Sequence, residues 1–393
     1  MEFRPASHFW SRWLSGGWRW TQSHRLFRSL IEPLLQDRMS LLLVLAPLSL
    51  TASKAIPDVR LALGFLGIVP FSSIIYQACE SLSTNLDPIP GELLVTLADN
   101  LIELTVGIVG LAKGEIRLIQ HMIMGSVLCY SLLVIGSSFL AVGFLNKETR
   151  FNAASTSTIT SLNVTALNFL AIATISHITG WPVNGIADPL GSRVAALVLI
   201  ALYTVYLCFK LKTHASLWDE EKDAEEDETE EPNMATATVS ILPIAAIFWL
   251  AISLTFVSLC SSVVFDNIRG SVWESHRIFL GFILFPFLAN VKDYQSSCIE
   301  ALKRKLDLSI LWTLGSSMQI MLLTSPVLVI IGWILKQPMT FQFRPFEIIA
   351  VFFGSFVVNI LVADGKTNYL EGAISIALYV IIALAAFLYT NEV

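Results

Sequence analysis

The stretch ADNLIEL, residues 98–104, places three polar side chains inside a segment that is otherwise apolar and long enough to cross a membrane. Asp99 and Asn100 lie four and three positions before Glu103, so all three share one face of a helix. A charged side chain at the bilayer centre costs about 2.5–3.5 kcal/mol on insertion scales, and such residues face a cavity or a partner. The stretch therefore predicts a polar site inside a membrane.

The stretch LANVKDY, residues 288–294, repeats the pattern 190 positions later, with Asn290 and Asp293 in the places of the first asparagine and glutamate. Gly125 and Gly315 keep the same offset. The two acidic motifs fall in the third and eighth of the expected spans. The two spans are five apart in the chain, and because five is an odd number they enter the membrane from opposite sides. This arrangement predicts an inverted repeat, which is typical of secondary transporters with a binding site at the midplane.

The composition indicates an integral membrane protein, with 54% hydrophobic residues, 14% charged residues and a mean hydropathy of +0.67. The formal net charge of −6 reflects one acidic run, residues 219–231, and gives no indication of nucleic-acid binding. The sequence contains no Ser/His/Asp set, histidine cluster or Gly-rich phosphate loop. We therefore expect neither an enzyme nor a bound cofactor.

About eleven segments are apolar enough to be candidate spans, six before an acidic linker at 213–236 and five after it. With a cytosolic N-terminus, 15 basic residues face the cytosol and nine face the other side. The linker is then cytosolic, and the C-terminus lies in a lumen or outside. The expected spans are 39–54, 59–80, 91–111, 115–144, 155–180, 193–212, 237–265, 275–299, 307–334, 344–363 and 368–390.

Two carboxylates and two amide oxygens form an oxygen-only site, which suits Ca²⁺ or a similar divalent cation. The predicted metal ligands are Glu103 and Asp293, with Asn100 and Asn290 beside them. Protons and the cation would compete for these carboxylates, and a site exposed alternately to each side would then perform antiport. An intramembrane acid can instead simply bond to a neighbouring helix.

Three stretches resemble the calcium/cation–proton exchangers of fungal and plant vacuoles: DNLIELTVGIVGLAKGEIRLIQ (99–120), LGSSMQIMLLTSPVLVIIGW (314–333) and DGKTNYLEG (364–372). The resemblance covers roughly residues 39–390. It implies an all-α polytopic membrane protein with one peripheral helix and two inverted five-helix repeats. It also implies Ca²⁺ and proton transport in the vacuolar membrane or another acidic endomembrane. The implied divisions are 1–38, cytosolic; 39–58, peripheral helix; 59–212, first repeat; 213–236, linker; and 237–393, second repeat.

The resemblance also implies the roles of seven residues. It assigns the first carboxylate and its partner to Glu103 and Asn100, and the second pair to Asp293 and Asn290. Polar residues along the ion path would be Gln319, Gln120 and Glu80.

Several departures from the family pattern mark a divergent member. Asp99 replaces a glycine, Lys292 an alanine, Tyr294 a histidine, Ser262 a glutamate and Tyr130 an asparagine. Lys292 either neutralises a neighbouring aspartate and shifts the cation preference, or points away and pairs locally. A third alternative is a non-transporting scaffold or sensor with the same fold. Whether the chain forms a homo-oligomer stays open.

Overall fold

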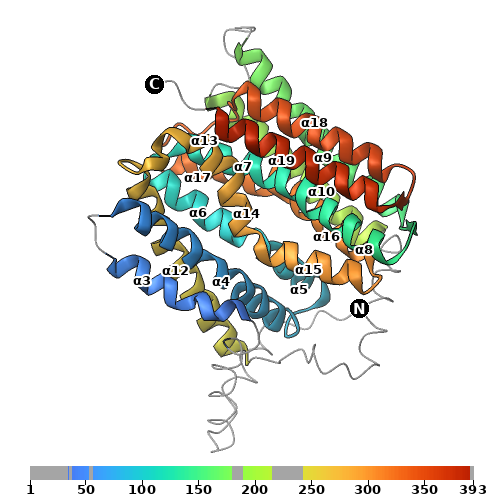
Figure 1. The fold of residues 1–393 in the computed structure, drawn as a ribbon, viewed down its shortest axis with the longest axis horizontal. Helices are drawn as coiled ribbons and strands as arrows, with labels where there is room; N and C mark the ends of the chain where they lie inside the picture. The colour runs from blue at the N-terminus through green and yellow to red at the C-terminus, as the bar shows by residue number, and fades with distance from the viewer. Residues whose placement is uncertain (1–33, 35–37, 53–55, 179–188, 215–241, 390–393) are drawn as a thin grey trace, which may run out of the picture.

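The computed structural model of the chain describes residues 34, 38–52, 56–178, 189–214 and 242–389, and these are almost entirely helical (Figure 1). The N-terminal segment before residue 34 and the acidic run lie outside the described residues, so their cytosolic placement stays a prediction. The elements of the first half are η1 (Arg38–Val44), α3 (Leu45–Thr51), α4 (Pro57–Ser83), α5 (Pro88–Ala98), α6 (Leu101–Ala112), α7 (Ile116–Leu128), η2 (Cys129–Val134), α8 (Ile135–Leu145), β1 (Thr149–Arg150), α9 (Ala153–Ile178), α10 (Pro189–Cys208) and η3 (Phe209–Thr213). Those of the second half are α12 (Pro243–Ile268), η5 (Val272–His276), α13 (Arg277–Phe279), η6 (Leu280–Leu284), α14 (Phe285–Ala289), α15 (Val291–Leu302), α16 (Leu306–Gln319), η7 (Ile320–Thr324), α17 (Ser325–Ile334), α18 (Pro345–Val362), β2 (Lys366–Thr367) and α19 (Tyr369–Leu388).

Eight helical runs among the described residues are long and apolar enough to cross a membrane, or nine if the bent pair α5–α6 is one span. The predicted polytopic all-α fold is confirmed, whereas the count of eleven spans stays a prediction. The short α3 and the polar α9 occupy the other two expected spans but are not among the eight. The expected span 275–299 is represented by the run Val272–Ala289, and α15 follows this run as a separate helix with charged residues. The sequence of α9 is rich in serine, threonine and asparagine, which lowers its mean hydropathy.

The repeat seen in the sequence recurs in the backbone. α6 ends in a left-handed residue, Gly114, with φ of 74°, and α15 ends in another 190 positions later, Arg304, with φ of 68°. In the first turn the backbone nitrogen of Glu115 donates to the carbonyl of Gly110, at 2.9 Å. In the second turn the backbone nitrogen of Lys305 donates to the carbonyl of Glu300, also at 2.9 Å. α7 and α16 then begin at equivalent positions, and each runs into a π-helical segment, η2 or η7. The two halves therefore share one helical framework.

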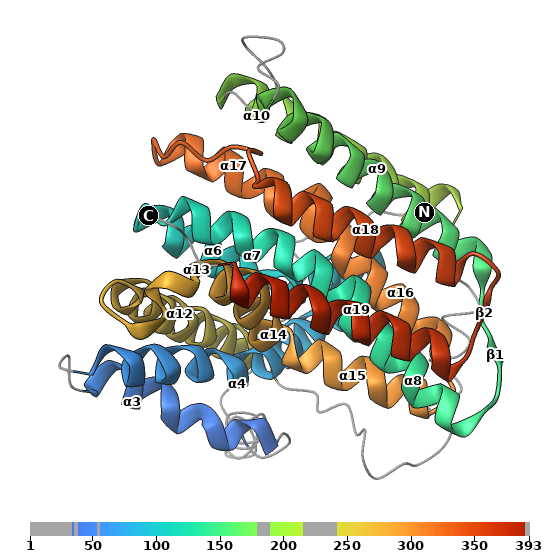
Figure 2. The ribbon, with the colours of Figure 1, turned by 45° about the horizontal axis from the view of Figure 1, so that its top comes forward.

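The helices lie broadly alongside one another (Figure 2). α3 and α12 pack against α4 on one side of the molecule, and α9, α10 and α18 lie on the other (Figures 1 and 2). Between these groups, α7–η2 and α16–η7 contact each other. The polar centre of the protein is built where these two helical runs meet.

α8 and α19 approach each other at backbone distance. A Cβ atom on Gly372 would lie 2.4 Å from the backbone nitrogen of Leu140, and one on Gly143 would lie 2.5 Å from that of Tyr369. The short strands β1 and β2 pair antiparallel at the end of the same two helices. Small residues allow such close packing of membrane helices. The two helices are thus joined along their length and at one end.

Replacing Gly125 by alanine is expected to destabilise the fold by about 1–3 kcal/mol or more, as overpacking does. The new Cβ would lie 2.0 Å from the backbone oxygen of Phe282, which cannot rotate away. The repeat-related variant Gly315→Ala is the matched control, because its Cβ would have no other heavy atom within 4 Å. Thermal unfolding in detergent measures both variants. Equal melting temperatures would contradict the close packing at Gly125.

Candidate functional site

The first acidic motif lies at a break between two helices. α5 and α6 meet at an angle of 60°. Asn100 precedes α6 with φ of −103° and ψ of 3°, and Glu103 lies in the first turn of that helix. The first turn of a helix has free backbone N–H groups and a partial positive charge, both of which stabilise an anion. The break therefore makes a buried carboxylate tolerable.

The second motif has the same local structure. Asn290 separates α14 from α15 with φ of −102° and ψ of 16°, and Asp293 lies in the first turn of α15. Its backbone geometry therefore matches that of Asn100 within a few degrees of φ. The two halves of the chain thus present their carboxylates in the same way, as the sequence repeat predicts.

Each motif is bonded to a helix of the other half. The amide nitrogen of Asn100 donates to the side-chain oxygen of Gln319, at 2.6 Å, at the end of α16. The hydroxyl of Tyr130, in η2, lies 2.5 Å from a carboxylate oxygen of Asp293 and 3.1 Å from the amide oxygen of Asn290. Four predicted site residues are therefore joined across the repeat interface.

Glu103 is the open member of this site. Its side chain is 1% exposed, yet neither carboxylate oxygen makes a well-formed hydrogen bond, and only the amide of Asn290 and the backbone of Glu103 interact with it more weakly. The amide oxygen of Asn100 and the amide nitrogen of Asn290 are also buried without one. Glu103, Asp293 and Asp99 lie within electrostatic range of one another. Because buried polar atoms are nearly always satisfied, these unpaired oxygens mark a place for a ligand that carries positive charge.

The site has free space on one side only. Gly315, one turn before Gln319, is buried, yet a Cβ atom there would have no other heavy atom within 4 Å. At the repeat-related Gly125, the backbone of Phe282 fills that space. The two halves therefore differ at this repeat-related pair: space is free beside Gly315 and filled beside Gly125.

Lys292 forms no ion pair within 4.0 Å with an acid among the described residues. Its ammonium group donates to the hydroxyl of Ser296, at 3.0 Å, and lies 5.7 Å from the ring centroid of Tyr76. Its charge acts on Asp99 and Asp293 over a longer distance. Of the alternatives for this lysine, the structure favours local pairing over direct neutralisation.

Gln120 lies away from the two carboxylates. Its amide group donates to the backbone oxygen of Thr340, at 2.8 Å, and accepts from Arg117, at 3.0 Å. Its neighbour His121 is bonded to the buried Glu347 of α18. Gln120 precedes Tyr130 by ten residues, or about 15 Å of helix. The structure therefore places it in the joint between α7 and the segment that leads into α18.

The remaining predicted residues lie on α4, α12 and α15. Glu80 is half-buried in the last turn of α4, and Ser262 is half-buried in α12. Tyr294 follows Asp293, and its backbone nitrogen donates to the carbonyl of Asn290 at 3.0 Å. Their roles stay predictions.

Sequence reasoning recognised Tyr130 as a departure from the family pattern but did not include it among the site residues. One signal was available, because position 129 is the repeat mate of Gln319, and the tyrosine comes directly after it. The long aromatic side chain reaches the motif of the other half from this position.

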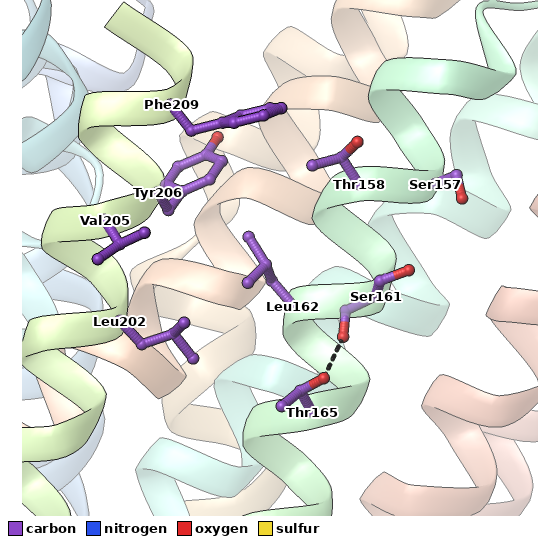
Figure 3. Close-up of a pocket in the computed structure, with 9 residues that line it drawn as sticks. All are labelled: Ser157, Thr158, Ser161, Leu162, Thr165, Leu202, Val205, Tyr206 and Phe209. Carbon is purple, nitrogen blue, oxygen red and sulfur yellow. Dashed lines mark hydrogen bonds between the residues drawn. The ribbon is translucent and has the colours of Figure 1, made fainter. Parts of the chain in front are cut away.

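Within the described residues, no three histidine, cysteine, aspartate or glutamate side chains are grouped to hold a metal ion. A site for transported cargo built here would depend on two carboxylates and neutral oxygens. Another cavity, of about 460 Å³, lies between α9 and the α10–η3 helix (Figure 3). Ser161, Thr165, Tyr206 and Phe209 are among the residues that line it, and none of its lining residues is acidic. That cavity therefore lacks the charge to neutralise a cation.

Two repeat-related carboxylates at helix breaks, with free space beside them, are the features of a secondary ion transporter. The chain belongs to the sodium/calcium exchanger protein family, which matches residues 59–212 and 245–388. The family resemblance of the sequence is thereby confirmed.

Several relatives align along most of the chain. The vacuolar calcium ion transporter of Schizosaccharomyces pombe is 32% identical over 363 residues, which cover 91% of this chain and 86% of that protein. The vacuolar cation/proton exchanger 2 of Oryza sativa subsp. japonica is 30% identical, covering 96% and 87%. The Ca²⁺/H⁺ antiporter of Aphanothece halophytica is 32% identical, covering 82% and 88%.

Two solved structures share the fold. Native YfkE superposes with a TM-score of 0.72 at 25% identity and covers 88% of this chain and 99% of its own. The H⁺/Ca²⁺ exchanger CAX superposes with a TM-score of 0.65 and covers 92% of each chain. Its identity is 14%, so this second likeness concerns the fold alone.

Proposed function

We propose that the protein exchanges Ca²⁺ for protons across a membrane, and that the two ions take turns on Glu103 and Asp293. The observation that carries this proposal is Glu103, buried with both oxygens unpaired and within electrostatic range of Asp293. The relatives named as calcium transporters and cation/proton exchangers support the same function.

Charge balance explains why the two ions would alternate. Burying two unneutralised carboxylates in one site is costly. One divalent cation or two protons neutralises the pair, so the arrival of one displaces the other. The unpaired amide oxygen of Asn100 adds a neutral ligand, which suits the oxygen-rich coordination of Ca²⁺. Asp293 would become available to the cation when the hydroxyl of Tyr130 turns away.

Alternating exposure would follow from an exchange of packing between the halves. In this structure space is free beside Gly315, while Gly125 is packed against Phe282. In the opposite state we expect the space to open at Gly125 and close at Gly315. The distribution of lysine and arginine supports a cytosolic location for the turn between α15 and α16.

The proposed location is the vacuolar membrane or another acidic endomembrane, with Ca²⁺ leaving the cytosol as protons leave the lumen. The vacuolar relatives support this location. Transport driven by an existing proton gradient requires no bound cofactor.

Vesicles with an acidic interior, reconstituted with the full chain, test the function. We expect uptake of radiolabelled Ca²⁺ that stops when a protonophore removes the gradient. Uptake of another cation in its place would indicate an altered ion preference. If no tested cation enters, the proposal fails and a non-transporting scaffold or sensor remains.

A further inference from the structure

One face of α16 carries a row of buried hydroxyl groups that have no role in the binding of the cation proposed above. Ser309, Thr313 and Ser317 recur at every fourth residue and are 1%, 3% and 0% exposed. We call these three and their hydroxyl partners Ser138, Ser297 and Ser131 the hydroxyl stripe. Its oxygen–oxygen distances are 2.9 Å for Ser309 to Ser138, 2.6 Å for Ser309 to Ser297, 3.0 Å for Ser138 to Ser297, 3.1 Å for Thr313 to Ser297 and 3.3 Å for Ser317 to Ser131.

An unsatisfied amide lies at the inner end of the hydroxyl stripe. Asn163, in α9, is 2% exposed and donates to the hydroxyl of Ser317 at 2.9 Å. Its amide oxygen is buried and has no hydrogen-bond partner. A buried acceptor of this kind marks the position of a water molecule or another proton donor.

The fold does not require these hydroxyls. At the repeat-related positions of α7, the chain has Ile119, Ile123 and Val127, all buried. The counterparts of Ser297 and Ser138 are Gly107 and Leu328, and they pack together: a Cβ on this glycine would lie 2.6 Å from the leucine side chain. The same register is therefore apolar and closely packed in one half and polar in the other. Packing alone gives no reason for the difference.

The two ends of the stripe lie where a proton route needs them. From Ser309 to Ser317 the stripe spans about 12 Å of helix. The outer end lies just inside the α15–α16 turn, where Lys303 is exposed. At the inner end, Ser131 contacts Ser317 and lies next in sequence to Tyr130, whose hydroxyl bonds Asp293; a water molecule would have to bridge from this end to the carboxylate.

We propose that the hydroxyl stripe carries protons between Asp293 and the membrane side at which α15 and α16 join, separately from the cation. This inference rests on the proposed exchange. A hydroxyl both donates and accepts a hydrogen bond. In each hop one O–H bond breaks as the next forms, so a proton that enters at one end releases a proton at the other. Water molecules complete the route where two hydroxyls on one helix lie a full turn apart.

The cation has a different path. Gly315, with free space beside it, lies two residues after Thr313. Two residues correspond to a rotation of about 200° around the helix axis, so Gly315 and Thr313 face nearly opposite directions. Gln319, bonded to Asn100, shares the face of Gly315. On the opposite face, direct hydrogen bonds of 2.6–3.1 Å leave no room for a metal ion among the linked hydroxyls of Ser309, Ser138, Ser297 and Thr313. α16 thus separates a cavity for the cation from a row of groups for the proton.

The variant Thr313→Val tests the route, because it removes a hydroxyl and keeps the shape of the side chain. In reconstituted vesicles we expect the maximal rate of Ca²⁺ uptake to fall on the order of fivefold. Removing a positioned proton-transfer group from an enzyme lowers the rate by roughly a hundredfold or more. We expect a smaller decrease here because a water molecule can replace the missing hydroxyl. The KM for Ca²⁺ should stay unchanged, and the rate ratio between H₂O and D₂O should rise. Thr313→Ser, which keeps the hydroxyl, should restore both readouts.

The matched control is Ile123→Val, at the same register of α7, for which we expect the wild-type rate and isotope effect. If Thr313→Val lowers only the melting temperature, the hydroxyls merely join the helices and the route is overturned. A raised KM at an unchanged maximal rate would assign the stripe to the cation and also overturn it. In either case the exchange itself stands. A wild type that moves no cation overturns both proposals.

Discussion

Glu103→Gln is expected to abolish Ca²⁺ uptake driven by a proton gradient. The amide keeps the size of the side chain but removes the charge that the cation must neutralise. Removing one member of a buried charge pair costs about 3 kcal/mol or more, which corresponds to roughly a hundredfold or more in affinity. Direct binding of radiolabelled Ca²⁺ to the purified protein, together with vesicle uptake, measures the loss.

The control is Glu148→Gln, an exposed carboxylate that pairs with Lys366 at 2.8 Å near β1. The ammonium group of Lys366 lowers the pKa of this carboxyl group, which is therefore fully charged near neutral pH. Its loss should leave uptake unchanged. Uptake by the Glu103→Gln protein at the rate of this control would remove Glu103 from the transport site.

Tyr130→Phe is expected to lower the KM for Ca²⁺ by about tenfold. In the structure the phenol hydroxyl bonds Asp293 at 2.5 Å, and this bond must break before both carboxylates can hold the cation. A hydrogen bond to a charged group contributes about 1.5–3 kcal/mol, and 1.4 kcal/mol corresponds to tenfold in affinity. Initial rates of uptake at increasing Ca²⁺ concentration provide the measurement.

Tyr203→Phe serves as the control, since this tyrosine is buried in α10 and its hydroxyl has no hydrogen-bond partner. Its KM should equal that of the wild type. A higher KM in Tyr130→Phe would show that the phenol oxygen is a ligand of the cation instead of its competitor.

Much of the site was predictable because local sequence determines it. The paired motifs at Asn100 and Asn290 form equivalent helix breaks, and the constant offset of 190 follows from equal element lengths in the two halves. The partner of each motif was harder to predict, because contacts between repeats depend on how whole helices cross. Gln319 was assigned through the resemblance, whereas the role of Tyr130 emerged only from the packed structure.

Apolar content predicted spans at 155–180 and 275–299, but it could not predict which polar residues in them contact the other half. Asn163 of α9 donates to Ser317, and Asp293 and Ser297 of α15 contact Tyr130 and Ser138. The direction of Lys292 depended on Ser296 and Tyr76, and Tyr76 is remote from it in sequence. Spacing alone could not choose between its alternatives.

The backbone contacts between α8 and α19 constrain how the protein can change shape. With Gly372 seated against Leu140, and with β1 paired to β2 beyond the helix ends, neither helix can slide or tilt without the other. These two helices form a fixed frame, although one comes from each half of the chain. Rocking during turnover must therefore occur at other helix contacts, and a crosslink between residues 149 and 367 should leave the transport cycle running.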